Sequence, residues 1–160
     1  MEGNKVQPRA ILVFGAPGSG KTTFSERFAQ KFHSAFFDLG ELEKEHDLDR
    51  KMTLFLLEQL AHTKSTLVIE GILDTEKERT EVRNVLRRAG YNPSLVWIQT
   101  DVNTIRQRLR LKNRSAAKAK KEYETRIEKM EAPSEIEAPI VLSGKHTFET
   151  QLRHVLTQLA

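Results

Sequence analysis

The chain has 160 residues, carries a formal net charge of +4 and contains no cysteine. This length favours a single domain over residues 1–160, and the absence of cysteine excludes disulfides and thiolate metal sites. The segment Met1–Arg9 is polar, and no apolar run approaches the length of a membrane span, so the sequence predicts a cytoplasmic protein that has no membrane partner.

Short apolar runs alternate with helical patterns along the whole chain. Strands are predicted at Ile11–Phe14, Ala35–Phe37, Thr66–Ile69, Leu95–Ile98 and Pro139–Leu142. Helices are predicted at Lys21–Phe32, Glu41–Ala61, Thr75–Ala89, Val102–Lys112, Lys121–Met130 and Phe148–Leu159. The strands lack polar alternation, which is typical of a sheet covered on both faces. This pattern predicts an α/β fold with a parallel sheet between two layers of helices.

The sequence GAPGSGKT at residues 15–22 follows the apolar run 10–14 and matches the pattern G-x-x-x-x-G-K-[ST] of a phosphate-binding loop. Its glycines allow successive N–H groups to approach phosphate oxygens, and the following helix adds the positive end of its dipole. Lys21 would reach the β- and γ-phosphates, and the Thr22 hydroxyl would bind Mg²⁺. A dinucleotide fingerprint is excluded, because Thr23 stands where that motif has its third glycine.

The predicted nucleotide site therefore covers nine consecutive residues. They are Gly15, Ala16, Pro17, Gly18, Ser19, Gly20, Lys21, Thr22 and Thr23.

Carboxylates follow several of the predicted strands, at the sheet edge where open parallel sheets bind ligands. Asp38 ends the second strand and is a candidate general base for an acceptor hydroxyl, but with Glu41 it also spells a helix capping box. Glu70 ends the third strand and, beside Gly71, is a candidate for holding Mg²⁺ or its water. Asp101 follows the fourth strand and is interpreted mainly as a helix cap.

A basic block from Arg106 to Lys121 contains no acidic residue and predicts a cationic lid at about residues 110–121. Arg106, Arg110 and Arg114 are spaced to share one helix face, and Arg110 and Arg114 are the candidates for stabilising charge on the transferring phosphoryl group. The irregular stretch Asn113–Ala119 is predicted to be a mobile loop. The alternative interpretation of the block is a solvated helix face. The histidines form no metal-binding pair, so zinc is not predicted.

Taken together, the phosphate loop, Asp38, Glu70-Gly71, the arginine series and Glu131-Ala-Pro133 resemble the small P-loop kinases. The resemblance, which also includes Arg79 and Arg83, is to the polynucleotide 5′-hydroxyl kinases and zeta-toxin-like kinases. It implies the nucleoside-monophosphate-kinase-like three-layer fold of the P-loop NTPases, with five parallel strands in the order 2-3-1-4-5. It also implies ATP as donor, Asp38 as base and a lid that carries arginines.

Two residues depart from those families. Glu41 stands where polynucleotide kinases have an arginine, so a nucleic-acid acceptor stays open but is not favoured. Asp74 stands where adenylate-type kinases have a phosphate-binding arginine, which weakens the nucleoside-monophosphate kinase alternative.

The sequence thus predicts an ATP- and Mg²⁺-dependent phosphotransferase that acts on a hydroxyl acceptor, with Lys21, Asp38, Arg110 and Arg114 as catalytic residues and Thr22 and Glu70 at the metal. The alternative from another class is a nucleotide-dependent switch that hydrolyses ATP slowly. The sequence indicates no particular acceptor and no oligomeric state.

Overall fold

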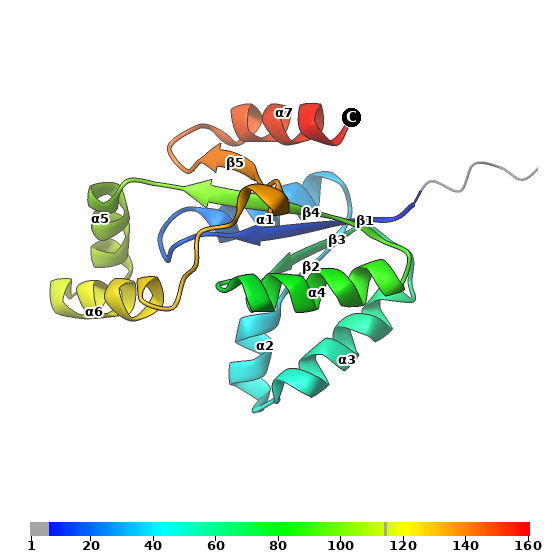
Figure 1. The fold of residues 1–160 in the computed structure, drawn as a ribbon. Coiled ribbons are helices and arrows are strands. Elements are labelled where there is room, and N and C mark those ends of the chain that lie inside the picture. Colours follow the sequence, from blue (N-terminus) through cyan, green and yellow to red (C-terminus); the bar gives the residue numbers. More distant parts are fainter. Residues whose placement is uncertain (1–6, 114) are drawn as a thin grey trace, which may run out of the picture.

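A central parallel sheet organises the computed structural model, which describes residues 7–113 and 115–160 (Figure 1). Its strands are β1 (Arg9–Phe14), β2 (Ala35–Asp38), β3 (Leu67–Glu70), β4 (Asn92–Gln99) and β5 (Ile140–Ser143). They lie in the order β2-β3-β1-β4-β5, and every pairing is parallel. The fold class and the strand order predicted from the sequence are confirmed.

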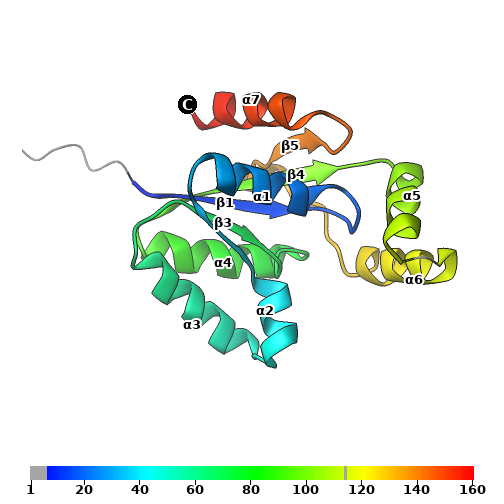
Figure 2. The same cartoon turned by 180° about the vertical axis from the view of Figure 1, so that it is seen from behind.

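Helices cover both faces of this sheet. One face packs against α1 (Lys21–Lys31) and α7 (Phe148–Leu159), and the other against α3 (Arg50–Ala61) and α4 (Glu76–Arg88), as the view from behind in Figure 2 also shows. The remaining helical elements are α2 (Leu39–His46), α5 (Val102–Asn113), α6 (Ala116–Ile127) and the short 3₁₀ helix η1 (Glu135–Glu137). Among the described residues, no helix is long and apolar enough to cross a membrane.

The central strand β1 is buried on both sides and separates two apolar clusters. Ile11 and Val13 belong to the cluster beneath α1 and α7, whereas Leu12 and Phe14 belong to the cluster beneath α3 and α4. Successive side chains of a strand point to opposite faces, so an uninterrupted apolar run is required where both faces are covered.

The sequence predicts one helix over Glu41–Ala61, but the structure has two, and that prediction is wrong. Asp47 adopts a left-handed conformation with φ 50° and ends α2. Two residues later the Asp49 carboxylate accepts a hydrogen bond from the Met52 N–H at 2.7 Å and begins α3. Aspartate favours both conformations because its short polar side chain bonds to nearby backbone.

The segment Asn113–Ala119 is predicted as a loop, but Asn113 ends α5 and residues 116–119 belong to α6, while residue 114 lies outside the described residues. The Ser115 hydroxyl accepts a hydrogen bond from the Lys118 N–H at 3.3 Å and begins α6 at Ala116, five residues before the predicted start at Lys121. Alanine and lysine are strong helix formers, which explains the longer helix. Whether this segment is mobile stays a prediction.

Strand β4 begins at Asn92, earlier than predicted, although it contains Pro93. The partner strand β5 pairs only with Val96–Gln99, so β4 is an edge strand over its first half. Proline is tolerated there because it lacks only the N–H that an edge strand can leave unpaired.

Candidate functional site

The phosphate loop connects β1 to α1 at the carboxyl edge of the sheet. Gly20 has φ 97° and directly precedes Lys21, the first residue of α1. Only glycine adopts this conformation at little cost, and it leaves the first N–H groups of α1 without a side-chain cap. The start of this helix is therefore arranged as an anion-binding site.

Three side chains from α1 and β3 meet behind the phosphate loop. The Thr22 hydroxyl donates to Glu70 Oε2 and the Ser25 hydroxyl donates to Glu70 Oε1, each at 2.9 Å. Glu70 is fully buried, and this burial raises its pKa, against the opposing effects of Ser25, Lys21 and Thr22. Because the two hydroxyls bond to the carboxylate, they fix where its oxygens lie relative to the loop.

Lys21 lies close to this carboxylate. Burial lowers the pKa of Lys21, whereas the negative charges of Glu70, Asp74 and Asp38 act in the opposite direction. A polyphosphate bound to the loop would add further negative charge and so favour the protonated ammonium.

Asp38 ends β2 next to Glu70, its directly paired neighbour on β3. Its Oδ1 accepts a hydrogen bond from the Glu41 N–H at 3.0 Å and caps α2. A Cβ added at Gly71 would lie 2.5 Å from this Oδ1 and would clash with it. The absence of a side chain at Gly71 therefore allows Asp38 and the start of α2 to pack against the backbone of Gly71. Gly71 also lines the charged cavity, and the capping role of Asp38 is present alongside any catalytic role.

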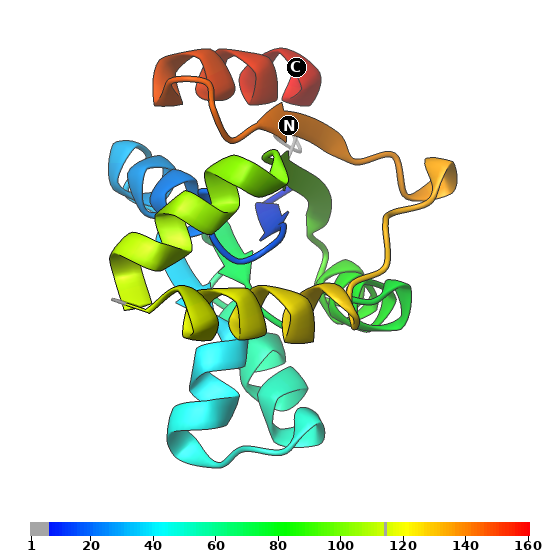
Figure 3. The same cartoon turned by 90° about the vertical axis from the view of Figure 1, so that its left-hand side faces the viewer.

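A charged cavity of about 1180 Å³ contains this site. Its lining includes Lys21, Thr22, Asp38 and Asp74, together with basic side chains from the two helices that lie across the carboxyl ends of the strands, α5 and α6 (Figure 3). We call this space the charged cavity.

Arg108 is the arginine of α5 that contacts the phosphate loop. Its guanidinium donates to the Gly18 carbonyl at 3.0 Å and to the Gly144 carbonyl at 2.9 Å. Lys112, one helical turn further, also lines the charged cavity. Arg108 therefore joins α5 to the phosphate loop and to the turn after β5.

The arginine series chosen from the sequence lies on a different face of α5. Arg106 and Arg110 are exposed, and neither is among the residues that line the charged cavity. Arg114 lies outside the described residues. The predicted catalytic roles of Arg110 and Arg114 stay predictions, whereas Arg108 and Arg126 of α5 and α6 line the charged cavity.

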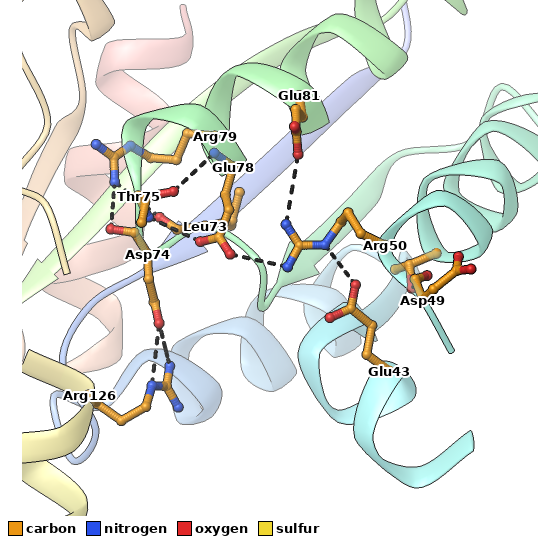
Figure 4. Close-up of polar contacts among 11 residues, drawn as sticks. Glu43, Asp49, Arg50, Leu73, Asp74, Thr75, Glu78, Arg79, Glu81 and Arg126 are labelled. Atoms are coloured by element: carbon orange, nitrogen blue, oxygen red, sulfur yellow. Dashed lines mark hydrogen bonds and ion pairs between the residues drawn. The ribbon is translucent and has the colours of Figure 1, made fainter. Parts of the chain in front are cut away.

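Arg126 of α6 reaches across to the loop that follows β3 (Figure 4). Its guanidinium donates to both carboxylate oxygens of Asp74, with the shortest distance 3.1 Å. Both residues line the charged cavity, and the pair is partly buried. It links α6 to the loop that follows β3 at the edge of the sheet.

Arg79 of α4 also contacts the loop that follows β3 (Figure 4). It is fully buried, donates to the Glu137 carboxylate at 2.7 and 3.1 Å, and donates to the carbonyls of Leu73, Asp74 and Glu131. The hydrogen bonds between Arg79 and the Glu137 carboxylate lower the pKa of Glu137. Arg79 thus ties together the β3–α4 loop, the chain after α6 and η1.

Thr22 and Glu70 fit a magnesium site chemically, because Mg²⁺ prefers hard oxygen ligands and keeps several waters. Their side chains are joined by a hydrogen bond beside the phosphate loop. Among the described residues there is no group of three or more histidine, cysteine or acidic side chains placed to hold a metal. Any Mg²⁺ here would depend on phosphate and water for its other ligands.

The positions of Arg108 and Arg126 in the charged cavity were not predicted from the sequence. The basic block includes most of α5, but its composition does not indicate which face of that helix turns toward the phosphate loop. Ile105 and Leu109 are buried and mark that face, and a helical projection of these two residues would have selected Arg108 and Lys112.

Fold and site together define a P-loop kinase-like domain. Residues 11–135 match the family AAA_33, described as an AAA domain, and the chain belongs to that family. A curated relative, the RNA1 polyprotein of Raspberry ringspot virus (strain cherry), is 27% identical over 95 residues. That alignment covers 59% of this chain and 4% of the polyprotein, so the chain spans only a small part of this relative's length.

Several solved structures, two of them kinases, share this fold. A gluconokinase from Sinorhizobium meliloti 1021 is similar with a TM-score of 0.73 and 16% identity, over 97% of this chain and 93% of that one. Chaetomium thermophilum Kti12 in complex with ADP-AlF3 has a TM-score of 0.70 and 16% identity, over 94% and 96%. The APS kinase CysC of Mycobacterium tuberculosis, in complex with AMPPNP and APS, has a TM-score of 0.66 and 18% identity, over 96% and 98%.

Proposed function

We propose that the chain is an ATP- and Mg²⁺-dependent kinase that transfers the γ-phosphate of ATP to a hydroxyl acceptor. The observation that carries the proposal is that the phosphate loop, Thr22 and the Asp38 carboxylate line one cavity, while the buried Glu70 accepts a hydrogen bond from Thr22 directly behind it. The fold shared with a gluconokinase and an APS kinase supports the same class of reaction.

In this proposal the acceptor oxygen attacks the γ-phosphorus, the bond to the β–γ bridging oxygen breaks, and ADP leaves. Asp38 takes the proton of the acceptor hydroxyl, since one of its oxygens caps α2 and the other is not committed to that bond. Lys21 balances charge on the β- and γ-phosphates. Bound Mg²⁺ would supply further charge neutralisation next to Thr22 and Glu70.

Arg108 and Arg126 are the proposed arginines of the reaction. Arg108 contacts the phosphate loop directly, and Arg126 lines the same cavity from α6. Cations at these positions would stabilise the charge that develops on the transferring phosphoryl group.

The acceptor side of the charged cavity favours a hydroxyl compound without a phosphate group. Acidic side chains gather there on α2 and around the loop after β3, including Glu41, Asp74 and Glu78. Two of these acids are already paired with cations, Asp74 with Arg126 and Glu78 with Arg50, each at 3.1 Å. A monophosphate acceptor would have to compete with Asp74 for Arg126, which argues against a nucleoside-monophosphate kinase.

The proposal is tested by following ADP formation with and without candidate acceptors. The panel contains sugars, nucleosides, nucleoside monophosphates and oligonucleotides with a 5′-hydroxyl. Asp38→Asn is compared with Asp47→Asn, which changes an exposed carboxylate at the end of α2 that does not line the cavity.

We expect one class of acceptor to stimulate ADP formation in the wild type and in Asp47→Asn, but not in Asp38→Asn. ADP formation that is equal with every acceptor and with none would instead favour the slow nucleotide-dependent switch.

A further inference from the structure

A second cavity of about 800 Å³ lies over the carboxyl ends of β4 and β5. It shares no lining residue with the charged cavity. Its walls are the two lid helices on one side and the chain between α6 and β5, which arcs back around the other side in Figure 3. We call it the apolar cavity.

Helix α6 separates the two cavities. Its residues Glu122 and Arg126 line the charged cavity, whereas Tyr123 and Ile127 line the apolar one. This alternation follows the helical period, so one face of α6 is built for charge and the other for apolar contact.

The walls of the apolar cavity are aromatic and aliphatic. Trp97 on β4 and its paired neighbour Val141 on β5 form the sheet side, and Ile105, Tyr123 and Ile127 form the helix side. Val141 is 44% exposed and Ile127 is 37% exposed, and both line this open cavity. Apolar side chains left open inside a cavity of this size are typical of a small-molecule site.

The charged residues of the lining are Lys145, Asp101 and Glu131, and each of them already has a partner. Lys145 forms an ion pair with Asp101 at 3.3 Å, and the Glu131 carboxylate accepts a hydrogen bond from the Glu76 N–H at 2.9 Å. The apolar cavity therefore has few charged groups in its lining, whereas the charged cavity has many and is suited to phosphates.

We propose that the apolar cavity is a second ligand site, which takes an uncharged small molecule with an aromatic ring and a polar group directed to the rim. The inference does not rest on the proposed kinase activity. It places the ligand beside α6, on the opposite side of that helix from Arg126.

Trp97 is the chain's only tryptophan and lines this cavity, so contact between a quencher bound there and Trp97 can be followed by fluorescence. The probe is 4-bromobenzyl alcohol, an uncharged aromatic molecule whose bromine quenches tryptophan on contact. We expect saturable quenching that persists when a non-hydrolysable ATP analogue with Mg²⁺ is also bound, its binding being checked by calorimetry.

Val141→Phe fills the apolar cavity and should weaken probe binding by about tenfold or more. Val102→Phe is the matched control, because Val102 is similarly exposed, at 41%, but does not line the cavity. Ala132→Phe, on the wall opposite the lid helices, provides a second filling variant if Val141→Phe fails to fold. Non-saturable quenching, equal quenching in filled and control variants, or displacement by the ATP analogue would overturn the proposal.

Discussion

Replacing Arg79 with methionine should destabilise the protein strongly, although Arg79 does not line the charged cavity. Methionine keeps much of the length and apolar volume of the side chain but removes its charge and its donors. The Glu137 carboxylate, whose side chain is only 6% exposed, then loses both of its hydrogen bonds to the guanidinium. The carbonyls of Leu73, Asp74 and Glu131 lose a donor as well.

The magnitude follows from the charge that is left behind. Breaking a buried ion pair by removing one partner typically costs about 3–5 kcal/mol. The Arg79 guanidinium also lies 5.0 Å from the centroid of the Phe14 ring, a contact of roughly 0.5–2 kcal/mol that lies within the uncertainty of that figure. For a chain of this length, a loss of about 3–5 kcal/mol lowers Tm by roughly 6–20 °C.

The assay is urea unfolding followed by circular dichroism, on Arg79→Met, on Glu137→Leu and on the double variant. The double variant leaves no buried charge unpaired, so it should recover most of the lost free energy of unfolding. If Arg79→Met lowers the free energy of unfolding by less than about 1 kcal/mol, or if the effects of the two single variants simply add in the double variant, this ion pair does not hold the loop after β3.

Three further predictions concern the site and the same ion pair. Asp38→Asn keeps an oxygen that can cap α2, so kcat should fall by roughly 10²–10⁴-fold with stability unchanged, whereas Asp38→Ala should also lose about 1 kcal/mol in urea unfolding. Arg108→Ala should weaken ATP binding in calorimetry by about tenfold, because it frees the phosphate loop from α5, and the exposed control Arg110→Ala should change it by no more than about twofold. Because Arg79 holds the pKa of Glu137 below its usual 4.5, this pair contributes stability that is present above pH 4.5 and is lost as the pH falls through the depressed pKa. In Arg79→Met the buried Glu137 carboxylate is unpaired, so acidification should stabilise this site rather than weaken it, and urea midpoints against pH would show both trends.

The sequence predicted the parallel sheet and the phosphate loop because both depend on local patterns. An apolar run, a glycine-rich turn and a helix are consecutive in the chain, and their alternation with further strands predicts a parallel α/β sheet, whereas the strand order was implied by the resemblance to small P-loop kinases. The capping box of Thr75 and Glu78 was predictable for the same reason, and it is present at the start of α4.

Features that depend on distant residues were not predictable in this way. The Arg79–Glu137 pair joins residues that are 58 positions apart, so no periodic pattern in the sequence predicts it. The break between α2 and α3 depends on Asp47 taking a left-handed conformation, which competes with a continuous helical pattern. The apolar cavity exists only because the chain after α6 returns around the sheet edge, which single-sequence patterns do not encode.

The proposed enzyme moves the γ-phosphate of ATP to a hydroxyl oxygen in the charged cavity. The most direct measurement follows γ-labelled ATP and separates label on the acceptor from label in inorganic phosphate, in the wild type and in Lys21→Ala. We predict label on the acceptor in the wild type and none in Lys21→Ala, because this ammonium lies beside the phosphate loop. If the label appears only in inorganic phosphate with every acceptor, or if transfer is unchanged in Lys21→Ala, the proposed phosphate transfer is wrong.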